Sequence, residues 1–193
     1  GVVITGATGG TTNYTRVLDD NTSVTLTAPQ MLHNGADYEF VRWTRNAVSE
    51  TDGVLTLSFA IGEDTTCVAV YQRVYNLDVQ STPFTNVAIT GTPAGTTNYS
   101  RWVAEGATVN LTAPMYISDG AGTDAEFVNW TYGGSPVGTP SVGDLNYQFS
   151  MSEDATLEAV YQIIVRQIDV RSTPVTGVTI GGTYPGTTNY LTG

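Results

Sequence analysis

The stretch VAITGTPAGTTNY, residues 87–99, contains the pattern on which the chain is built. A short run of β-branched residues ends in glycine, and the motif Gly-Thr-Thr-Asn-Tyr follows a few residues later. The same order occurs at residues 2–14 and 178–190. Self-similarity at a spacing of about 90 residues is the signature of tandem modules. We therefore interpret the chain as part of an array of related units.

The ends of the chain do not coincide with the boundaries of the repeat units. The second unit, residues 75–165, is complete and begins with the strand NLDVQSTP at residues 76–83. The first unit, residues 1–74, starts at a position equivalent to Asn86 and lacks that strand. Residues 166–193 supply the strand again, as QIDVRSTP, together with the next strand of a third unit. Because the chain opens and closes within a unit, we expect a longer parent protein.

Composition limits the classes of function. The net charge is −11 and the pI about 4.1, and the seven cationic residues are all arginine. The absence of lysine excludes lysine isopeptide crosslinks, and the acidic balance argues against nucleic acid or an anionic membrane as partner. The sequence has neither a signal peptide nor an apolar run long enough to span a membrane. The single cysteine, Cys67, allows no internal disulfide, and its counterpart Leu157 marks the position as part of the core.

The periodicity predicts an all-β fold. Short β-branched and aromatic runs alternate with turn residues at intervals typical of antiparallel sandwiches with about seven strands per module. In residues 107–114, ATVNLTAP, the alternation places Val109 and Leu111 inward. Phe127 and Trp130 are the largest apolar side chains available for that core.

Two motif groups resemble known bacterial repeats. The order VxLTAP, FVxW and EDxTxxAVY, within Val24–Tyr71 and Val109–Tyr161, resembles the divergent internalin B-type repeat. The segment STPxTxVxIxGTxxGTT is similar to the PEGA surface-layer repeat. The resemblance implies extracellular modules of prokaryotic stalks, filaments or adhesins, without catalytic residues. Internalin-type repeats have a β-grasp-like fold with a helix, but no helical periodicity occurs here, so we predict immunoglobulin-like sandwiches and keep the β-grasp as the alternative.

Catalytic chemistry is not expected. A nucleophile needs a nearby base, and the only histidine, His33, lies in a loop that the second unit does not repeat. Calcium is the one ligand that the sequence suggests, at the oxygen-rich loop bounded by Asp119 and Asp124. No other cofactor is predicted.

Five Asn-x-Ser/Thr sequons fit a Thr-rich secreted protein. They lie at Asn13, Asn21, Asn98, Asn110 and Asn129. The tyrosines that end the repeated motif, Tyr14, Tyr99 and Tyr190, fit either a structural corner or a stacking platform for sugars.

The sequence leaves two functional hypotheses. In the first, the modules build an extracellular filament, stalk or surface layer, because the linkers Arg73–Asn76 and Ile163–Arg166 are apolar and look like strands that continue between modules. Its partners are adjacent repeats of one chain or, by donor-strand exchange, the missing first strand supplied to unit one by another copy. The donor segment runs from Arg166 to Pro174, with Ile168 and Val170 as its apolar residues. In the second hypothesis, the modules form a glycan- or host-binding adhesin.

Overall fold

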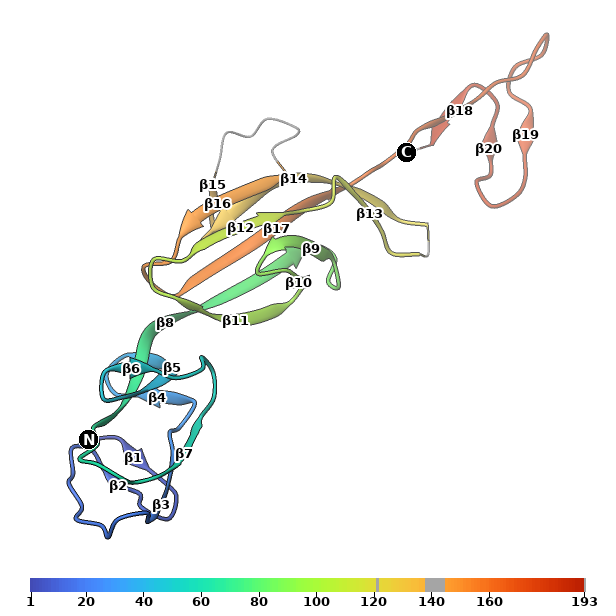
Figure 1. Ribbon diagram of the computed structural model, residues 1–193. Coiled ribbons are helices and arrows are strands. Elements are labelled where there is room, and N and C mark those ends of the chain that lie inside the picture. Colours follow the sequence, from blue (N-terminus) through green and yellow to red (C-terminus); the bar gives the residue numbers. More distant parts are fainter. Residues whose placement is uncertain (121, 138–144, 193) are drawn as a thin grey trace.

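The computed structural model describes residues 1–120, 122–137 and 145–192, with the backbone alone for residues 190–192, and every regular element in it is a β-strand. Module one (residues 1–74) contains β1 (Val3–Ile4), β2 (Gly10–Thr11), β3 (Ser23–Thr27), β4 (Met31–His33), β5 (Asp37–Arg45), β6 (Val48–Ser49), β7 (Thr56–Ala60) and the first half of β8 (Cys67–Thr82). Module two (residues 75–165) contains the rest of β8 and β9 (Ala88–Thr92), β10 (Gly95–Thr96), β11 (Tyr99–Ala104), β12 (Thr108–Thr112), β13 (Tyr116–Ser118), β14 (Asp124–Tyr132), β15 (Ser135–Val137), β16 (Asn146–Ser150) and β17 (Ala155–Ile163). The C-terminal segment (residues 166–193) contains β18 (Ile168–Val170), β19 (Thr179–Ile180), β20 (Gly186–Thr187) and β21 (Tyr190–Thr192). The three parts follow one another along an extended line (Figure 1).

Module two is a two-layer β-sandwich, as predicted. One layer has the strand order β10-β9-β12-β16, and the other has β13-β14-β17-β8 with β11 paired to β8. Val109 and Leu111 point into the core and are 0% exposed, while Trp130 is 2% exposed. The short strands β10, β13 and β15 add to the number expected from the periodicity. The described residues contain no helix of the kind that the β-grasp alternative requires, nor one that could cross a membrane.

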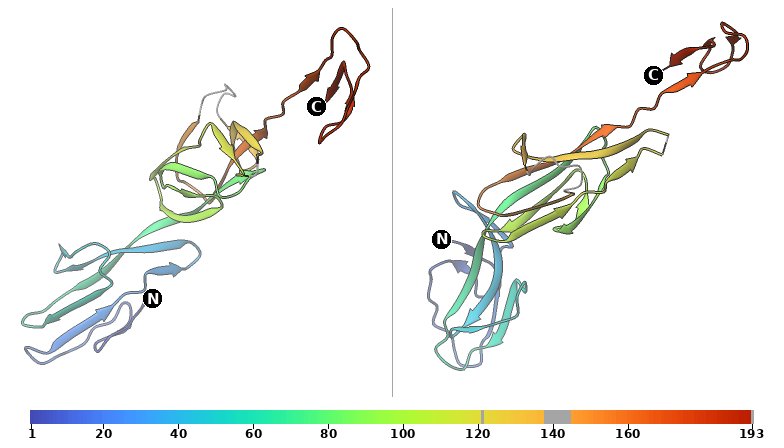
Figure 2. Two further views of the ribbon diagram at one scale, coloured as in Figure 1. Left: turned by 90° about the vertical axis from the view of Figure 1, so that its right-hand side faces the viewer. Right: turned by 90° about the horizontal axis from the view of Figure 1, so that it is seen from above.

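Module one repeats this architecture with fewer residues. The pair β3–β7 corresponds to β12–β16, and the pair β5–β8 corresponds to β14–β17. Its core is smaller and is formed by Ile4, Val24, Leu26, Ala28, Phe40, Trp43 and Leu57. Figure 2 shows the two modules joined by β8 from two further directions.

A β-bulge explains the repeated Phe-x-x-Trp spacing. In a regular strand, residues three apart face opposite sides of the sheet. The register shifts between Phe127 and Asn129 in β14, and between Phe40 and Arg42 in β5. The extra residue at the bulge places the Phe and Trp side chains on the same side of the sheet, so that both rings enter the core. Phe127 is 6% exposed, beside the buried Trp130.

β8 passes from one module into the next. Its first half pairs antiparallel with β5, and its second half pairs antiparallel with β11 and parallel with β17. The β8–β17 pair is the one parallel contact among the described strands, whereas the sequence had suggested antiparallel sheets throughout. The residues Arg73–Asn76 lie inside this strand, as expected.

The second linker differs from the prediction. β17 ends at Ile163 and β18 begins at Ile168, so Ile163–Arg166 does not continue as a strand. In contrast, β8 continues as one strand through the boundary between the modules, because β5 and β11 both pair with Val74. The Ile164 N–H still donates to the Asp124 carbonyl of β14 at 2.8 Å, but β21 pairs with β18 only from Ile168 to Val170, so no described strand pairs with residues 165–167.

Candidate functional site: an open strand position in module one

In module two, the second half of β8 closes the core. It lies between β17 and β11, with Leu77 opposite Ala155 and Val79 opposite both Leu157 and Tyr99. Leu77 and Val79 are both 0% exposed. This strand therefore joins two neighbours by backbone hydrogen bonds and seals the hydrophobic interior.

The corresponding position in module one is open. The first half of β8, the counterpart of β17, pairs with β5 along one edge, whereas its other edge pairs with β11 only at Val74, and no described strand pairs with residues 67–72 there. Residues 14–18, the counterpart of β11, form no strand. An edge with unpaired N–H and C=O groups is a template for a further strand.

Side chains around the open position are incompletely covered. Six of them are half-buried, whereas their counterparts in module two are at most 5% exposed. The module-one residues are Val2, Thr12, Thr65, Cys67, Ala69 and Tyr71, and the counterparts are Val87, Thr97, Ala155, Leu157, Ala159 and Tyr161. The difference follows from the absent strand, since these positions surround it in module two. The open position is therefore apolar along its floor.

Three polar contacts hold the strand in module two. Asp154 Oδ1 accepts a hydrogen bond from the backbone N–H of Asn76 at 2.8 Å. Asn98 Oδ1 accepts from the N–H of Ser81 at 3.3 Å, and the hydroxyls of Ser81 and Thr97 are 2.5 Å apart. The Glu-Asp turn and the Gly-Thr-Thr-Asn-Tyr motif thus each supply anchors for the first strand of the module.

The same anchors are present in module one without a strand to bind. Asp64 and Asn13, the counterparts of Asp154 and Asn98, are exposed and make no side-chain hydrogen bond within the described residues. Thr12, the counterpart of Thr97, accepts a bond from the N–H of Val2 at 2.8 Å, as Thr97 does from Val87 at 3.0 Å, but has no serine partner. The site consists of an unpaired edge, an apolar floor and three polar groups at its ends.

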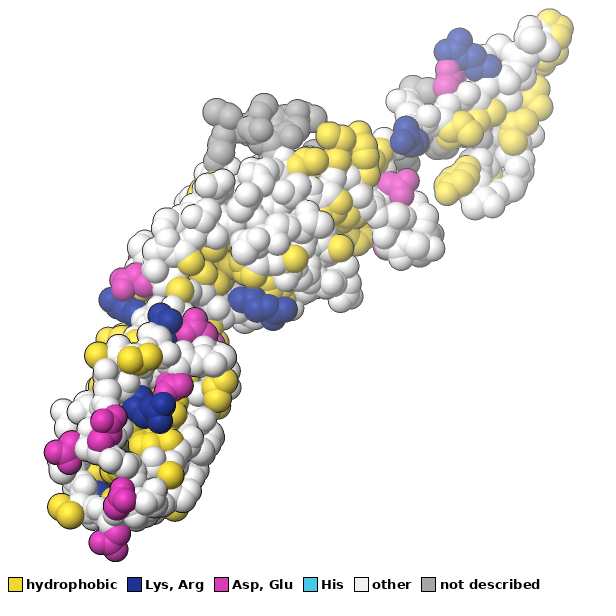
Figure 3. Space-filling model, viewed as in Figure 1, with side chains coloured by type: hydrophobic (Ala, Val, Ile, Leu, Met, Phe, Trp, Pro, Cys, Tyr) yellow, Lys and Arg dark blue, Asp and Glu magenta, His cyan; other side chains and the backbone are white. Residues whose placement is uncertain are grey.

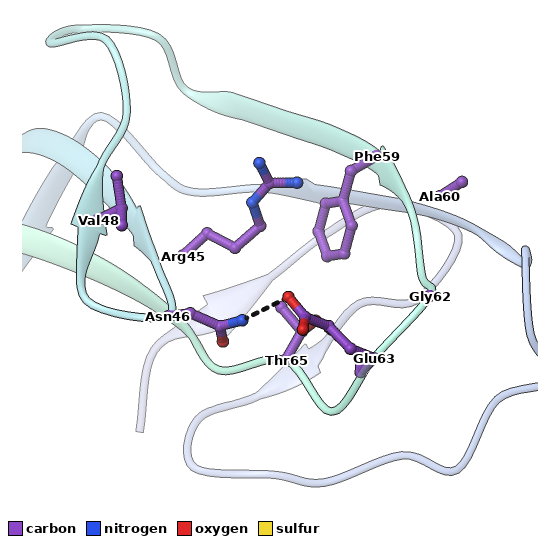
Figure 4. A pocket seen from close by; sticks show the side chains of 8 residues that line it. All are labelled: Arg45, Asn46, Val48, Phe59, Ala60, Gly62, Glu63 and Thr65. Atoms are coloured by element: carbon purple, nitrogen blue, oxygen red, sulfur yellow. Dashed lines mark hydrogen bonds between the residues drawn. The ribbon is translucent and has the colours of Figure 1, made fainter.

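A surface hollow adjoins this position and is shown in Figure 4. Its lining residues are Arg45, Asn46, Val48, Phe59, Ala60, Gly62, Glu63 and Thr65. The Arg45 guanidinium lies 5.1 Å from the centre of the Phe59 ring. In module two the same place is filled by Tyr132, whose ring packs edge-on against Phe149 at 5.3 Å. The hollow is therefore explained by a difference in packing and needs no ligand.

Cys67 lies on the floor of the open position. Burial raises the pKa of its thiol, the nearby Arg45 opposes that rise, and Glu50 adds to it. Partial burial and a raised pKa make a thiol poorly reactive. Cys67 is therefore suited to packing, as its counterpart Leu157 indicates, and its accessibility reports on whether the position is filled.

The residues of the donor segment lie at the other end of the chain. In β18, Ile168 pairs with Thr192 and Val170 with Tyr190, so the structure keeps this strand paired with β21 of its own segment. Ile168 is 52% exposed, Val170 is half-buried, and Arg166 and Pro174 are exposed. Apolar side chains accordingly reach the surface of the C-terminal segment (Figure 3).

The two predicted calcium ligands lie at the ends of the β13–β14 hairpin. Asp119 Oδ1 accepts from the N–H of Thr123 at 3.0 Å, and Asp124 pairs with Ser118. Residue 121 of the loop lies outside the described residues. Within the described part of the chain, no three acidic, histidine or cysteine side chains are gathered as metal ligands.

The sequons divide by exposure. Asn13, Asn21 and Asn98 are exposed. Asn110 and Asn129 are half-buried in strands, where Asn110 Oδ1 accepts from Asn146 and the Asn129 side-chain amide donates to the Trp130 carbonyl at 2.8 Å. A glycan needs a side-chain amide at the surface, so the exposed three are the geometrically accessible sites, although the Asn21 amide donates to Asp20 Oδ2 at 2.8 Å.

The repeated tyrosines form structural corners. The Tyr99 hydroxyl donates to the Pro93 carbonyl at 2.7 Å, and a Cβ on Gly95 would lie 2.7 Å from the Tyr99 ring. Tyr14 makes the equivalent bond to the Thr8 carbonyl at 3.0 Å. These half-buried rings are packed against glycine, which favours the structural interpretation over a sugar platform. The side chain of Tyr190 lies outside the described residues.

The expectation for His33 was wrong: the exposed side chain lies at the end of strand β4 and contacts Asp37 across the β4–β5 hairpin, which module two repeats as the β13–β14 hairpin with serine, Ser118, in place of the histidine. Sequence reasoning located the absent strand, but it missed Asp64 and Asn13 as its anchors. Their positions in motifs repeated at the same place in each unit are the signal that could have found them.

Comparisons with protein-family models, curated proteins and solved structures find no match for this chain.

Proposed function

We propose that the chain is a rod-forming segment of an extracellular structural protein, a filament, stalk or surface layer of a prokaryotic cell. The observation that carries the proposal is β8, which belongs to the sheets of two successive modules. Because one strand serves both sheets, bending between the modules distorts backbone pairing, whereas a flexible linker would bend freely.

Side chains reinforce the junction. Val74 is 1% exposed and pairs with Asp37 on one side and Ala104 on the other. The Arg73 guanidinium lies 3.7 Å from Glu105 and 4.8 Å from the centre of the Tyr75 ring. The module boundary is thus packed, and stability in such an array is a sum of unit and neighbour-interface terms.

The extracellular location rests on composition and resemblance. A Thr-rich chain without lysine and with one cysteine suits a secreted protein, and the acidic net charge of −11 favours solubility. The internalin B-type and PEGA-like motifs belong to surface proteins. The exposed sequons add surface positions for glycans at Asn13, Asn21 and Asn98.

The experiment is cryo-electron microscopy of native material from the producing cell, located with an antibody against module two. We expect extended rods or fibres outside the cell in which sandwiches follow one another at a regular spacing. A chain found as isolated monomers, or inside the cell, would contradict the proposal.

One observation favours the adhesin alternative. Trp102, on the edge strand β11, is 44% exposed, and an exposed aromatic ring can stack on a sugar. Its counterpart Val17 is 99% exposed, so the aromatic is not a feature of every unit. Glycan-array binding that is lost on Trp102→Ala, with folding unchanged, would move this alternative to first place.

A further inference from the structure

We propose that Asn34, in the turn between β4 and β5, is a modification site at which the side-chain amide is lost spontaneously and a carboxylate takes its place. The attacking group is the backbone nitrogen of Gly35, and the only other reactant is water. The inference goes beyond the proposed function, since it concerns the covalent chemistry of one turn. It rests on the sequence of this turn, its exposure, its hydrogen bonds and its counterpart in module two.

The reaction proceeds through a cyclic imide. The Gly35 nitrogen loses its proton to hydroxide and attacks Cγ of Asn34, so that a new N–Cγ bond forms and the bond between Cγ and Nδ2 breaks. The leaving nitrogen takes up a proton and departs as ammonia. Water then opens the imide at either of its two carbonyls. One opening gives aspartate in the normal backbone, and the other gives isoaspartate, in which the main chain continues through the side chain.

Glycine is the residue that favours this attack. It has no Cβ beside the attacking nitrogen and restricts the backbone least. Asn34 is the only asparagine in the sequence that precedes glycine. A Cβ built on Gly35 would meet no atom within 4 Å, and φ of Gly35 is +72°. The turn therefore leaves open space around the nitrogen that must move.

Both reacting groups are unrestrained. Asn34 and Gly35 are exposed. The backbone N–H of Asn34 donates to the Ala36 carbonyl at 3.0 Å, which closes the turn. Among the described residues, no hydrogen bond holds the Asn34 side chain or the Gly35 N–H. The side-chain amide therefore turns toward the nitrogen without breaking a contact.

Asn46 provides the contrast. It also lies in an exposed turn, has a φ of +48° and is followed by Ala47. Its Nδ2 donates to Glu63 Oε1 at 3.2 Å, and its Oδ1 accepts from the N–H of Thr66 at 2.8 Å. A side chain that is held through both polar atoms, beside a residue with a Cβ, is poorly placed for ring closure. Exposure alone therefore does not mark the site.

Module two already has an aspartate at the equivalent place. The sequence HNG at residues 33–35 aligns with SDG at residues 118–120, since β4 ends at His33 and β13 ends at Ser118. The glycines of the two turns have φ values of +72° and +74°. Aspartate is therefore compatible with this turn, whereas isoaspartate adds a carbon atom to the main chain between two paired strands.

The two products should differ in their effect on the hairpin. His33 pairs with Asp37, and Asp37 also pairs with Val74 at the boundary between the modules. Aspartate at position 34 should leave these pairs intact. The longer main chain of isoaspartate should disturb the end of the hairpin, so we expect the amides of β4 to exchange about tenfold faster in that product.

Peptide mapping of the aged protein tests the site. The intact chain is incubated at mildly alkaline pH in water enriched in heavy oxygen, and conversion at each asparagine is followed by mass spectrometry. We expect Asn34 to convert about tenfold or more faster than Asn46, because only Asn34 precedes a residue without a Cβ. The product should contain heavy oxygen, and the rate should rise with pH because the nitrogen attacks without its proton. Equal rates at the two asparagines would overturn the proposal.

Variants of the turn separate the reaction from general instability. Asn34→Gln keeps an amide but must close a larger ring, so conversion at this position should fall about tenfold or more. Gly35→Ala should also slow it, and circular dichroism checks that the chain with alanine at a left-handed φ still folds. Asn34→Asp is the matched control, which should keep the native exchange rates in β4 and release no ammonia from this turn. Conversion that is as fast in Asn34→Gln as in the native chain would contradict the imide route.

A peptide of residues 30–39 gives the rate in the absence of the fold. Since the turn leaves both reacting groups free, conversion in the folded chain should lie within about tenfold of that in the peptide. A folded chain that converts more slowly than this would show that the turn protects Asn34, and the proposal would be wrong. Neither result depends on whether the protein forms rods.

Discussion

Two tyrosines carry equivalent contacts in the two modules. The Tyr161 ring packs edge-on against Phe127 at 5.6 Å, and its hydroxyl donates to the Pro114 carbonyl at 3.0 Å. Tyr71 repeats both contacts with Phe40 and Pro29. Burial raises the pKa of both hydroxyls. The difference between them is coverage, since Tyr161 is 4% exposed and Tyr71 is half-buried beside the open strand position.

Replacing Tyr161 by phenylalanine keeps the ring and removes the hydrogen bond. We expect Tyr161→Phe to lower the free energy of unfolding of module two by about 1 kcal/mol at neutral pH. Chemical denaturation followed by tryptophan fluorescence measures it. Tyr71→Phe is the control and should cost less, because water can reach the Pro29 carbonyl more easily. The reverse order would contradict the coverage argument.

The raised tyrosine pKa values predict a loss of stability in alkali. The pKa is raised by burial for Tyr71, Tyr99, Tyr132 and Tyr161. Above about pH 10 the unfolded chain releases these protons while the folded chain retains them. The folded state then binds more protons, so the free energy of unfolding falls as pH rises. Denaturation at a series of pH values should show this fall, and Tyr161→Phe should make it shallower.

The bulges in β5 and β14 act at the level of single strands. Each adds one residue between Phe and Trp, so that two large rings share one face of the sheet. The indole N–H groups are also satisfied in equivalent ways, since Trp43 donates to the Leu55 carbonyl at 2.9 Å and Trp130 to the Leu145 carbonyl at 3.1 Å. The bulge therefore fixes both the apolar and the polar contacts of the core strand.

Deleting Val128 removes the extra residue of the β14 bulge. One of the flanking rings must then leave the core, and we expect a loss of about 3–5 kcal/mol, the cost of removing a buried aromatic side chain. Val128→Ala is the control. Val128 is 37% exposed, so its truncation should change stability by about 0.5 kcal/mol or less. Equal effects of the two changes in thermal unfolding would show that the bulge has no such role.

Across the whole molecule, the two modules differ in how well their cores are closed. Module two has a buried first strand with Leu77 and Val79 at its centre, and module one has none. We expect module one to unfold first. Native-state hydrogen exchange should show β3 and β7 exchanging about tenfold or more faster than β12 and β16, since local stability follows buried contacts. Uniform exchange across both modules would contradict this order.

The shared strand also predicts the shape of the molecule in solution. Inserting Gly-Ser-Gly-Ser between Tyr75 and Asn76 interrupts β8 at the junction and should create a hinge. Small-angle X-ray scattering should then show a shorter and broader distribution of interatomic distances. The same insertion beside Gly35, in an exposed turn of module one, is the control and should leave the extended profile unchanged. A flexible profile for the unmodified chain would argue against a rigid junction.

The repeat, the all-β class and the inward residues of the main strands can be predicted from the sequence alone. These features are local or periodic: alternation places Val109 and Leu111 inward, and the Glu-Asp and Gly-Thr-Thr-Asn-Tyr motifs recur in each unit. The sequence also located the position that lacks a strand, because the units align residue by residue. Three features became visible only in the folded chain: the parallel pairing of β8 with β17, the bulges, and the anchoring of the first strand by Asp154, Asn98 and Thr97. These contacts join residues apart in the chain, so the repeated motifs mark the anchor residues but do not show which strand they contact. They arise only when the two sheets close around one core.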